Sequence, residues 1–356
     1  MTVPVLPPLD EDQLDGHARA HHRLAARWSD SIDVVPLIRL AQRRLLIESH
    51  AKVEPVERAD SNPGLFPRPR SFLTREHELR MAAAEIAFRY VDTKTAMVTN
   101  GQLGSSIDAA TPQVLNAMLE GTMPTGIISN AGILRATQSK WHPDNNPMDH
   151  PRPEEVPELV EAAVDLAIRA PAPAIARAGW LAFTMLCIHP FVDGNGRTAR
   201  MLFQAVSSVE VPLGVDWGAV EQFSLRRVGY IDGLRSGQQV DRYHASCLNP
   251  LPFMQFALEC STAGALLVTK RLEALSEAYE RRISAGGTAL QALVTMSVEL
   301  WGIATLAELD GLGLTAEELA EVVNELVGLG SLVWTEMPAS RTPLGAARRR
   351  GLIVGA

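Results

Sequence analysis

A run of twelve residues from His189 to Arg200, HPFVDGNGRTAR, combines side chains that are suited to phosphate chemistry. His189 is the one side chain in the run that can take up a proton near neutral pH. Asp193 offers a hard oxygen ligand of the kind that Mg²⁺ prefers, and Mg²⁺ accompanies nucleotide phosphates. The first half of the run therefore holds a candidate base and a candidate metal ligand.

The second half of the run predicts an anion-binding helix start. Gly194 and Gly196 flank Asn195, so the loop can adopt positive φ and turn several N–H groups toward one point. A helix is expected to begin near Gly196, with the positive end of its dipole at the same point. Arg197 and Arg200 are three residues apart, so they share one helix face and can both reach a polyphosphate. A simple turn requires neither two spaced arginines nor the preceding His-Pro, and the run therefore favours a nucleotide site.

The run resembles the Fic motif, H-P-F-x-[D/E]-G-N-G-R-x-x-R, at every defined position. The resemblance covers about residues 73–260 and implies a mainly α fold, a Fic helical bundle with a short β-hairpin flap. It implies transfer of AMP from ATP to a Ser, Thr or Tyr hydroxyl of a target protein, with ATP and Mg²⁺ as cofactors. The implied residues are His189, Asn195, Arg197 and Arg200 for catalysis, Phe191, Gly194, Asn195, Gly196, Arg197, Arg200 and Tyr230 for ATP, and Asp193 for the metal.

Two more segments are similar to parts of the family. In the family, the region that corresponds to residues 126–157 forms a flap that aligns the target segment by strand pairing. Arg135 lies in a G-x-x-R sequence that resembles the start of this flap, and it is expected to help bind the target; a surface loop without a target role is the alternative. Residues 226–234 resemble a helix that would place Tyr230 near the adenine or ribose, although Arg226 and Ile231 replace the usual Asn and second Tyr.

An inhibitory carboxylate is also expected from the resemblance. Many Fic proteins carry an N-terminal helix ending in [S/T]-x-x-x-E-[G/N], whose Glu pairs with the second arginine of the motif. Glu54 is similar to that residue, but His50 and Pro55 depart from the pattern on either side of it. Glu120 is a rival match closer to the core, and a surface carboxylate at a helix end is the alternative role for Glu54.

Three other functions stay open. Relatives of Fic proteins remove AMP, which requires a well-placed regulatory Glu, or transfer phosphate or phosphocholine. The intact residues 193–196 favour AMP transfer over phosphorylation. A nucleotide-sensing transcriptional or interaction regulator is the alternative from a different class, and the intact His189 argues against an inactive core.

The composition predicts an ordinary soluble protein. Of the 356 residues, 46% are apolar and 21% charged, and the net charge of −8 argues against non-specific binding to nucleic acid or anionic membranes. The N-terminal residues lack the apolar stretch of a signal peptide, and no run of about eighteen apolar residues is apparent, so we expect a cytoplasmic protein without a membrane partner. Cys187, Cys247 and Cys260 are odd in number and far apart, which predicts free thiols.

Three segments are expected along the chain. Residues 1–72 form an N-terminal helical segment, in which His17, His21 and His22 are expected on a solvated helix face. Residues 73–260 form the Fic core. Residues 261–356 predict a small winged-helix-like domain, in which the would-be recognition helix carries Glu317, Glu318, Glu321 and Glu325. These carboxylates would repel phosphates, so the domain is expected to bind protein or a second copy of the chain rather than DNA.

Overall fold

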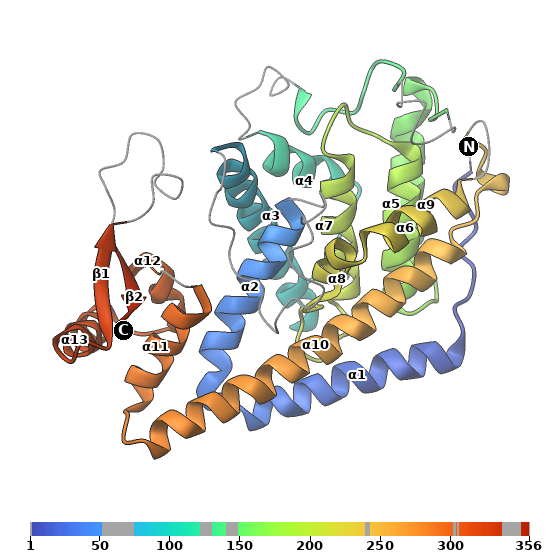
Figure 1. Cartoon of the computed structure of the whole chain (residues 1–356). Coiled ribbons are helices and arrows are strands. Elements are labelled where there is room, and N and C mark those ends of the chain that lie inside the picture. Colours follow the sequence, from blue (N-terminus) through green and yellow to red (C-terminus); the bar gives the residue numbers. More distant parts are fainter. Residues whose placement is uncertain are drawn as a thin grey trace. The chain divides into compact units, whose positions relative to one another are not determined.

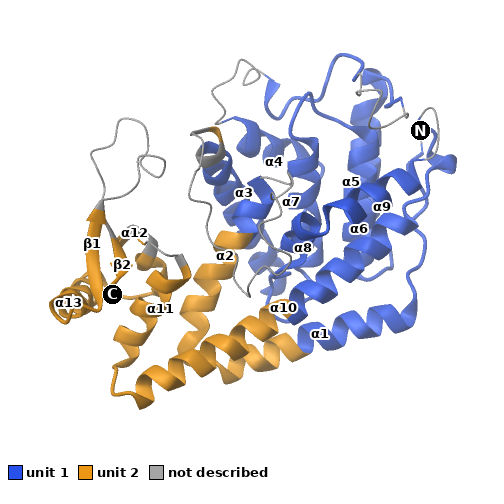
Figure 2. Ribbon diagram, in the orientation of Figure 1, with its two compact units in different colours: residues 1–22, 46–56, 79–266 blue, residues 23–45, 57–78, 267–356 orange. Residues whose placement is uncertain are grey.

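The computed structural model describes residues 2–51, 75–121, 130–139, 149–238, 243–301, 304, 306–336 and 350–355. The fold is mainly helical, as predicted, and the described residues contain one two-stranded sheet (Figure 1). The chain divides into two compact units, residues 1–22, 46–56 and 79–266 in unit 1 and residues 23–45, 57–78 and 267–356 in unit 2 (Figure 2). Four helices contribute residues to both units: α1 (Glu11–Asp30), α2 (Val35–Ala51), α3 (Arg75–Thr99) and α10 (Leu251–Ser284).

Unit 1 holds the motif and most of the helices. Besides parts of α1, α2 and α10 it contains α3 (Arg75–Thr99) from residue 79 onward, α4 (Thr111–Glu120), the 3-10 turn η3 (Pro153–Glu155), α5 (Val156–Arg169), α6 (Ala174–Ile188), α7 (Asn195–Ser207), α8 (Ala219–Leu225), α9 (Arg227–Gly237) and the 3-10 turn η4 (Ala245–Cys247). Helix α6 packs against α5 and α7, and α7 also packs against α4.

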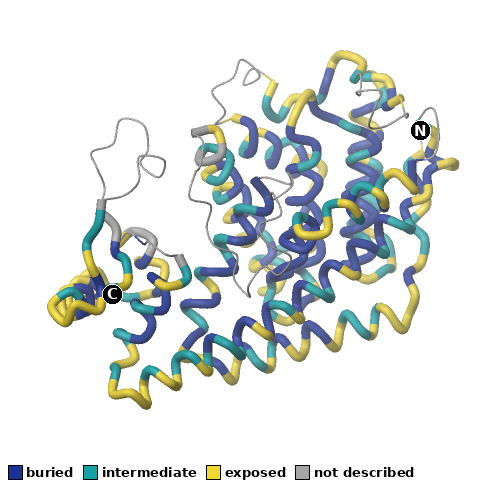
Figure 3. Tube along the Cα trace, viewed as in Figure 1, coloured by how far each residue is buried: buried dark blue, intermediate teal, exposed yellow. Residues whose placement is uncertain are grey.

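Helix α6 is buried almost all round, as its apolar sequence predicts (Figure 3). Trp180, Leu181 and Phe183 are fully buried on it. Because α6 runs through the core and ends at Ile188, it fixes the position of the next residue, His189. The first half of the candidate site therefore follows directly from a buried helix of unit 1.

The expectation of a solvated face for His17 and His21 is wrong. Both side chains belong to a polar cluster with Asp216 and Ser261, in which each Nε2 lies 3.0 Å from Ser261 Oγ. The Ser261 hydroxyl donates to the Asp216 carboxylate (2.8 and 2.9 Å), so both imidazoles must donate through Nε2–H. Burial lowers the pKa of His17 and that of His21 to about 4. Of the three histidines that were predicted to be exposed, only His22 is.

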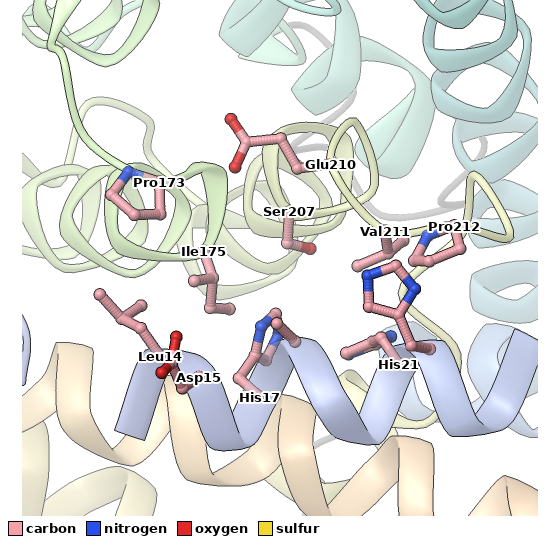
Figure 4. A pocket seen from close by; sticks show the side chains of 12 residues that line it. Leu14, Asp15, His17, His21, Pro173, Ile175, Ser207, Glu210, Val211 and Pro212 are labelled. Atoms are coloured by element: carbon pink, nitrogen blue, oxygen red, sulfur yellow. The ribbon is translucent and has the colours of Figure 1, made fainter. Parts of the chain in front are cut away.

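A cavity of about 280 Å³ lies beside this cluster (Figure 4). His17 and His21 line it from α1, and Ser207 and Glu210 line it from the end of α7 and the following turn. The described residues contain no group of three or more His, Cys, Asp or Glu side chains that could hold a metal ion. The hydrogen bonds of His17 and His21 to Ser261 connect the N-terminal part of α1 with the part of α10 that belongs to unit 1.

Unit 2 ends in helices followed by two antiparallel strands. Its elements after α10 are α11 (Ala289–Trp301), α12 (Leu306–Leu309), the 3-10 turn η5 (Asp310–Leu312), α13 (Ala316–Gly328), β1 (Leu332–Glu336) and β2 (Arg350–Val354), and a further turn η1 (Ile32–Val34) precedes α2. The strands are antiparallel, with Leu332 opposite Val354, and Ala304 bridges to Leu352. The four glutamates of α13 are exposed. The role of this domain as an interaction module stays a prediction, and residues 341–349 of the basic tail lie outside the described part.

Two further expectations concern the membrane and the cysteines. Among the described helices, α10 alone has an 18-residue window apolar enough to cross a membrane, with a mean hydropathy of 1.4. Half of that window is buried within the protein, as in the core helix of a soluble protein, so the helix is weak support for a membrane span. Cys187, Cys247 and Cys260 are all free, as predicted, and the first and last of them are buried.

Candidate active site

The candidate base, His189, follows the last residue of α6 in a left-handed conformation with φ of 52°. Its N–H donates to Met185 O (2.9 Å), so this residue ends the helix in the position that glycine usually occupies. A positive φ is uncommon for a residue with a side chain and has to be held by its surroundings. Burial, followed by the neighbouring His150 and Arg135, lowers the pKa of His189 to about 3, so its imidazole is neutral at pH 7.

The loop after His189 is fastened by the side chain of Asn195. Its Oδ1 accepts from Phe191 N (2.9 Å) and its Nδ2 donates to Phe191 O (2.8 Å), which closes the loop into a ring. Gly194 has φ of 80°, and α7 begins directly after it, one residue earlier than predicted. Asp193 is exposed, and its Oδ1 accepts from Gly194 N (2.6 Å).

Helix α4 supports this loop through two residues that are one helical turn apart. Asn116 Nδ2 donates to Asp193 O (3.0 Å), and Asn116 Oδ1 accepts from Gly132 N (2.9 Å). The Glu120 carboxylate packs on Gly194, where a Cβ would lie 2.7 Å from Glu120 Cδ. Gly194 is therefore required both for its backbone conformation and for the space that Glu120 occupies.

Arg197 is 9% exposed and lies between two carboxylates. Its Nη2 is 3.0 Å from Glu120 and 3.6 Å from Asp193 Oδ1. Its Nη1 is buried and has no hydrogen-bond partner in the described part of the chain. Burial raises the pKa of Glu120, although the Arg197 guanidinium opposes this. The rival regulatory residue thus pairs with the first arginine of the motif.

Arg200 is 6% exposed and has different partners. Its Nη2 donates to His50 O (3.0 Å) in the last turn of α2, and its guanidinium also donates to the Tyr230 hydroxyl. Its Nε has no partner among the residues that the structure describes. The guanidinium lies over the first turn of α7, because its Nη1 is 3.3 Å from the place of a Cβ at Gly196.

Tyr230 is 6% exposed and lies among aromatic rings, with Phe253 edge-on at a centroid distance of 5.3 Å. Its hydroxyl contacts Arg200, so in this structure it helps to fix that arginine. The expected place of Tyr230 beside a bound adenine or ribose stays a prediction.

Arg135 is buried beneath the loop. Its Nε donates to His189 O (2.8 Å), its Nη1 to Thr137 O (3.1 Å) and its Nη2 to Pro151 O (2.5 Å). Its backbone N–H donates to Pro190 O (2.9 Å). The side chain therefore supports the base from inside the protein, and a role in binding the target stays a prediction.

Two predicted features fall wholly or partly outside the described residues. Glu54 lies in the stretch 52–74, and residues 126–129 and 140–148 of the expected flap are also outside the described part. In the described parts of the expected flap, residues 130–139 and 149–157, no strand is present.

The donor set fits a magnesium ion that is bound mainly by a nucleotide. Mg²⁺ commonly takes one or two carboxylates and completes its shell with phosphate oxygens and water. Asp193 can provide one such carboxylate, since its side chain is half exposed. A dedicated protein cage is not required for this arrangement.

A helix-end histidine and two buried arginines, one short loop apart in a mainly helical unit, form a group of side chains suited to phosphate chemistry. Residues 114–207 match the model of the Fic/DOC family, in agreement with the resemblance that the motif indicates. No curated protein matches the sequence.

Among solved structures the chain is similar to a Fic family protein from Desulfovibrio desulfuricans G20, with 15% identity, a TM-score of 0.48 and coverage of 99% of this chain and 98% of that chain. It is also similar to residues 134–508 of Fic-1 from C. elegans, with 19% identity, a TM-score of 0.47 and coverage of 72% and 70%. A Fic domain containing signalling protein from Bacteroides thetaiotaomicron VPI-5482 gives 15% identity, a TM-score of 0.47 and coverage of 72% and 98%.

Two site neighbours, Asn116 and His150, are not evident from the sequence. His150 stacks on His189 with ring centroids 4.5 Å apart. No local pattern identifies either residue, because each contacts the loop from a distant part of the chain.

Proposed function

We propose that this protein transfers AMP from ATP to a Ser, Thr or Tyr hydroxyl of a target protein. The observation that carries the proposal is the pair of buried arginines at the start of α7, each with an N–H group that has no partner among the described residues. A buried, unpartnered guanidinium N–H is costly unless an anion binds it. The second support is the neutral imidazole of His189, only one loop away.

The proposed step forms one bond and breaks one bond. The target oxygen attacks the α-phosphorus of ATP, the bond from the α-phosphorus to the bridging oxygen of the β-phosphate breaks, and pyrophosphate leaves. His189 accepts the hydroxyl proton and becomes an imidazolium. Since that ring is neutral before the reaction, it is in the correct state to accept a proton.

The low pKa of His189 has a consequence for this step. A base with a pKa of about 3 is weak, and general bases work best when their pKa is near the working pH. A polyphosphate bound beside the ring would favour the imidazolium and raise the pKa. We therefore expect nucleotide binding itself to make His189 more basic.

Binding of ATP is assigned to the residues of the loop and of α7. Arg197 and Arg200 would hold the β- and γ-phosphates, and the backbone N–H groups of Gly194, Asn195 and Gly196 would face the phosphate oxygens. Phe191 is buried and fixes the loop through Asn195. Magnesium held by Asp193 would supply positive charge to the α/β oxygens when it is bound.

The test uses ATP labelled with ³²P at either the α or the γ position, with Mg²⁺ and a cell lysate as the source of targets. Transfer from the α but not the γ position, absent in His189→Ala, supports AMP transfer. Transfer from the γ position alone would replace the proposal with phosphorylation. His189→Ala should preserve ATP binding, and Arg200→Ala should weaken it, because Arg200 is expected to hold the γ-phosphate.

Restraint by Glu54 belongs to the same proposal. The carbonyl of His50, at the end of α2, accepts from Arg200, and Glu54 follows four residues later in the sequence. Glu54→Gly is therefore expected to increase labelling. If Glu54→Gly labels no more than wild type, this regulatory role is refuted while AMP transfer is not.

A target protein is the partner that the proposal requires, in the cytoplasm, where ATP is available. The exposed glutamates of α13 disfavour DNA as a partner of the C-terminal domain and leave a protein or a second copy of the chain. DNA binding that survives His189→Ala, without any transfer of label, would instead support the regulator function.

A further inference from the structure

A second histidine lies against the proposed base. The imidazoles of His150 and His189 are stacked, with centroids 4.5 Å apart and an angle of 25° between their planes. His150 is 4% exposed and comes from the segment just before η3, far from His189 in the sequence. A ring stacked at this distance restricts the rotation of its neighbour.

His150 is itself fixed by the helix that delivers the base. Its Nδ1 lies 2.9 Å from Cys187 O, in the last turn of α6. A carbonyl oxygen only accepts, so Nδ1 carries the proton and the tautomer of neutral His150 is determined. His150 therefore contacts both the backbone of α6 and the ring of the residue after it.

Charged side chains act on both rings of the histidine pair. Arg135 faces both rings and disfavours a proton on either, while Asp149, on the segment of His150, favours a proton on that ring. Cys187, from α6, presents its carbonyl to His150. Two stacked imidazoles repel each other when both are protonated, so each opposes protonation of the other.

We propose that His150 is a positioning residue for His189, whose stacked ring fixes the orientation of the base for proton transfer. This inference rests on the proposed function, in which His189 accepts the hydroxyl proton. It assigns to His150 no contact with ATP, so its loss should lower kcat and leave the KM for ATP unchanged. It also predicts that removal of His150 raises the pKa of His189, because a repelling and desolvating neighbour is lost.

The experiment compares His150→Ala and His150→Phe in the full chain. His150→Phe retains a flat ring and should keep kcat within about threefold of wild type, whereas His150→Ala should lose about tenfold or more, as expected for a misplaced catalytic group. His244→Ala, at an exposed histidine of unit 1, is the matched control and should behave as wild type. Titration of the His189 ring by NMR, with ¹³C-labelled histidine, should show a raised pKa in His150→Ala only.

Three results would overturn the inference. The first is that His150→Ala changes neither kcat nor the titration of His189. The second is that kcat falls equally in the Ala and Phe variants. The third is that His150→Ala raises the KM for ATP and leaves kcat unchanged. The NMR titration needs no transfer reaction, so it tests the contact between the rings even if wild type transfers no AMP. A failure of the proposed function would therefore be distinguishable from a failure of this inference.

Discussion

His50 offers a direct test of how burial controls protonation in unit 1. Its side chain is fully buried in the last turn of α2, and neither ring nitrogen has a hydrogen-bond partner among the described residues. Burial, together with the nearby Arg200 guanidinium, lowers the pKa of His50 to about 3 from 6.5. We predict that His50→Leu makes the protein less sensitive to acid.

The sign follows from the two states of the histidine. Below pH 6.5 the unfolded chain binds a proton at His50, whereas the folded protein does not until the pH approaches 3. Stability is therefore lost as the pH falls through this window, by about 1.4 kcal/mol per pH unit. At about pH 5 one such histidine costs about 2 kcal/mol, a large fraction of the 5–15 kcal/mol typical of a domain. Leucine has a similar volume and does not titrate.

The assay is urea unfolding of wild type and His50→Leu at several pH values between about 5 and 7, with m-values compared to check that the transition stays the same. The stability difference between the two proteins should change by about 2 kcal/mol in favour of the variant as the pH falls. His22→Leu, at an exposed histidine of α1, should follow the wild-type slope. Parallel slopes for wild type and His50→Leu would refute the reasoning.

Three further predictions concern the loop, the arginines and the packing of unit 1. Gly194→Ala should lower the melting temperature, and it should reduce the transfer of label tenfold or more. A side chain at positive φ costs about 1–2 kcal/mol, and Glu120 occupies the space that the new Cβ would need. Transfer at the wild-type level would contradict this. Glu120→Gln should tighten ATP binding about tenfold in calorimetry, because a carboxylate no longer competes with phosphate for Arg197. Weaker binding would show that Glu120 orients this arginine instead. Gly264→Ala should reduce the free energy of unfolding by about 1–3 kcal/mol, because its Cβ would lie 2.5 Å from Gly218 C; unchanged urea unfolding would mean that the backbone relaxes freely.

The sequence by itself determined the helices and the local chemistry of the motif. Residues 180–188, directly before the motif, are almost all apolar, which predicts a buried helix, and they lie in α6. The glycines around Asn195 predict a tight loop leading into a helix, and α7 begins at that residue. These features depend on neighbours a few residues away, so the pattern of residue types contains the information.

Tertiary structure decided which partners surround the motif. The contact of Glu120 with Arg197 joins residues 77 apart, that of His50 with Arg200 joins residues 150 apart, and His21 meets Ser261 across 240 residues. Judged by residue type alone, Glu120, His50 and His21 would be expected at the protein surface. They are buried because helices that are far apart in the sequence pack together around them.

The two histidines His21 and His150 illustrate the physical reason. An isolated histidine on a helix or in a loop can equally face water or a buried partner, and the free-energy difference depends on which groups the rest of the fold brings to it. Ser261 Oγ accepts a hydrogen bond from Nε2 of His21 and donates its own to Asp216, and Cys187 O accepts from Nδ1 of His150. The sequence specified the base and the arginines, whereas only the folded chain specified the residues that hold them in place.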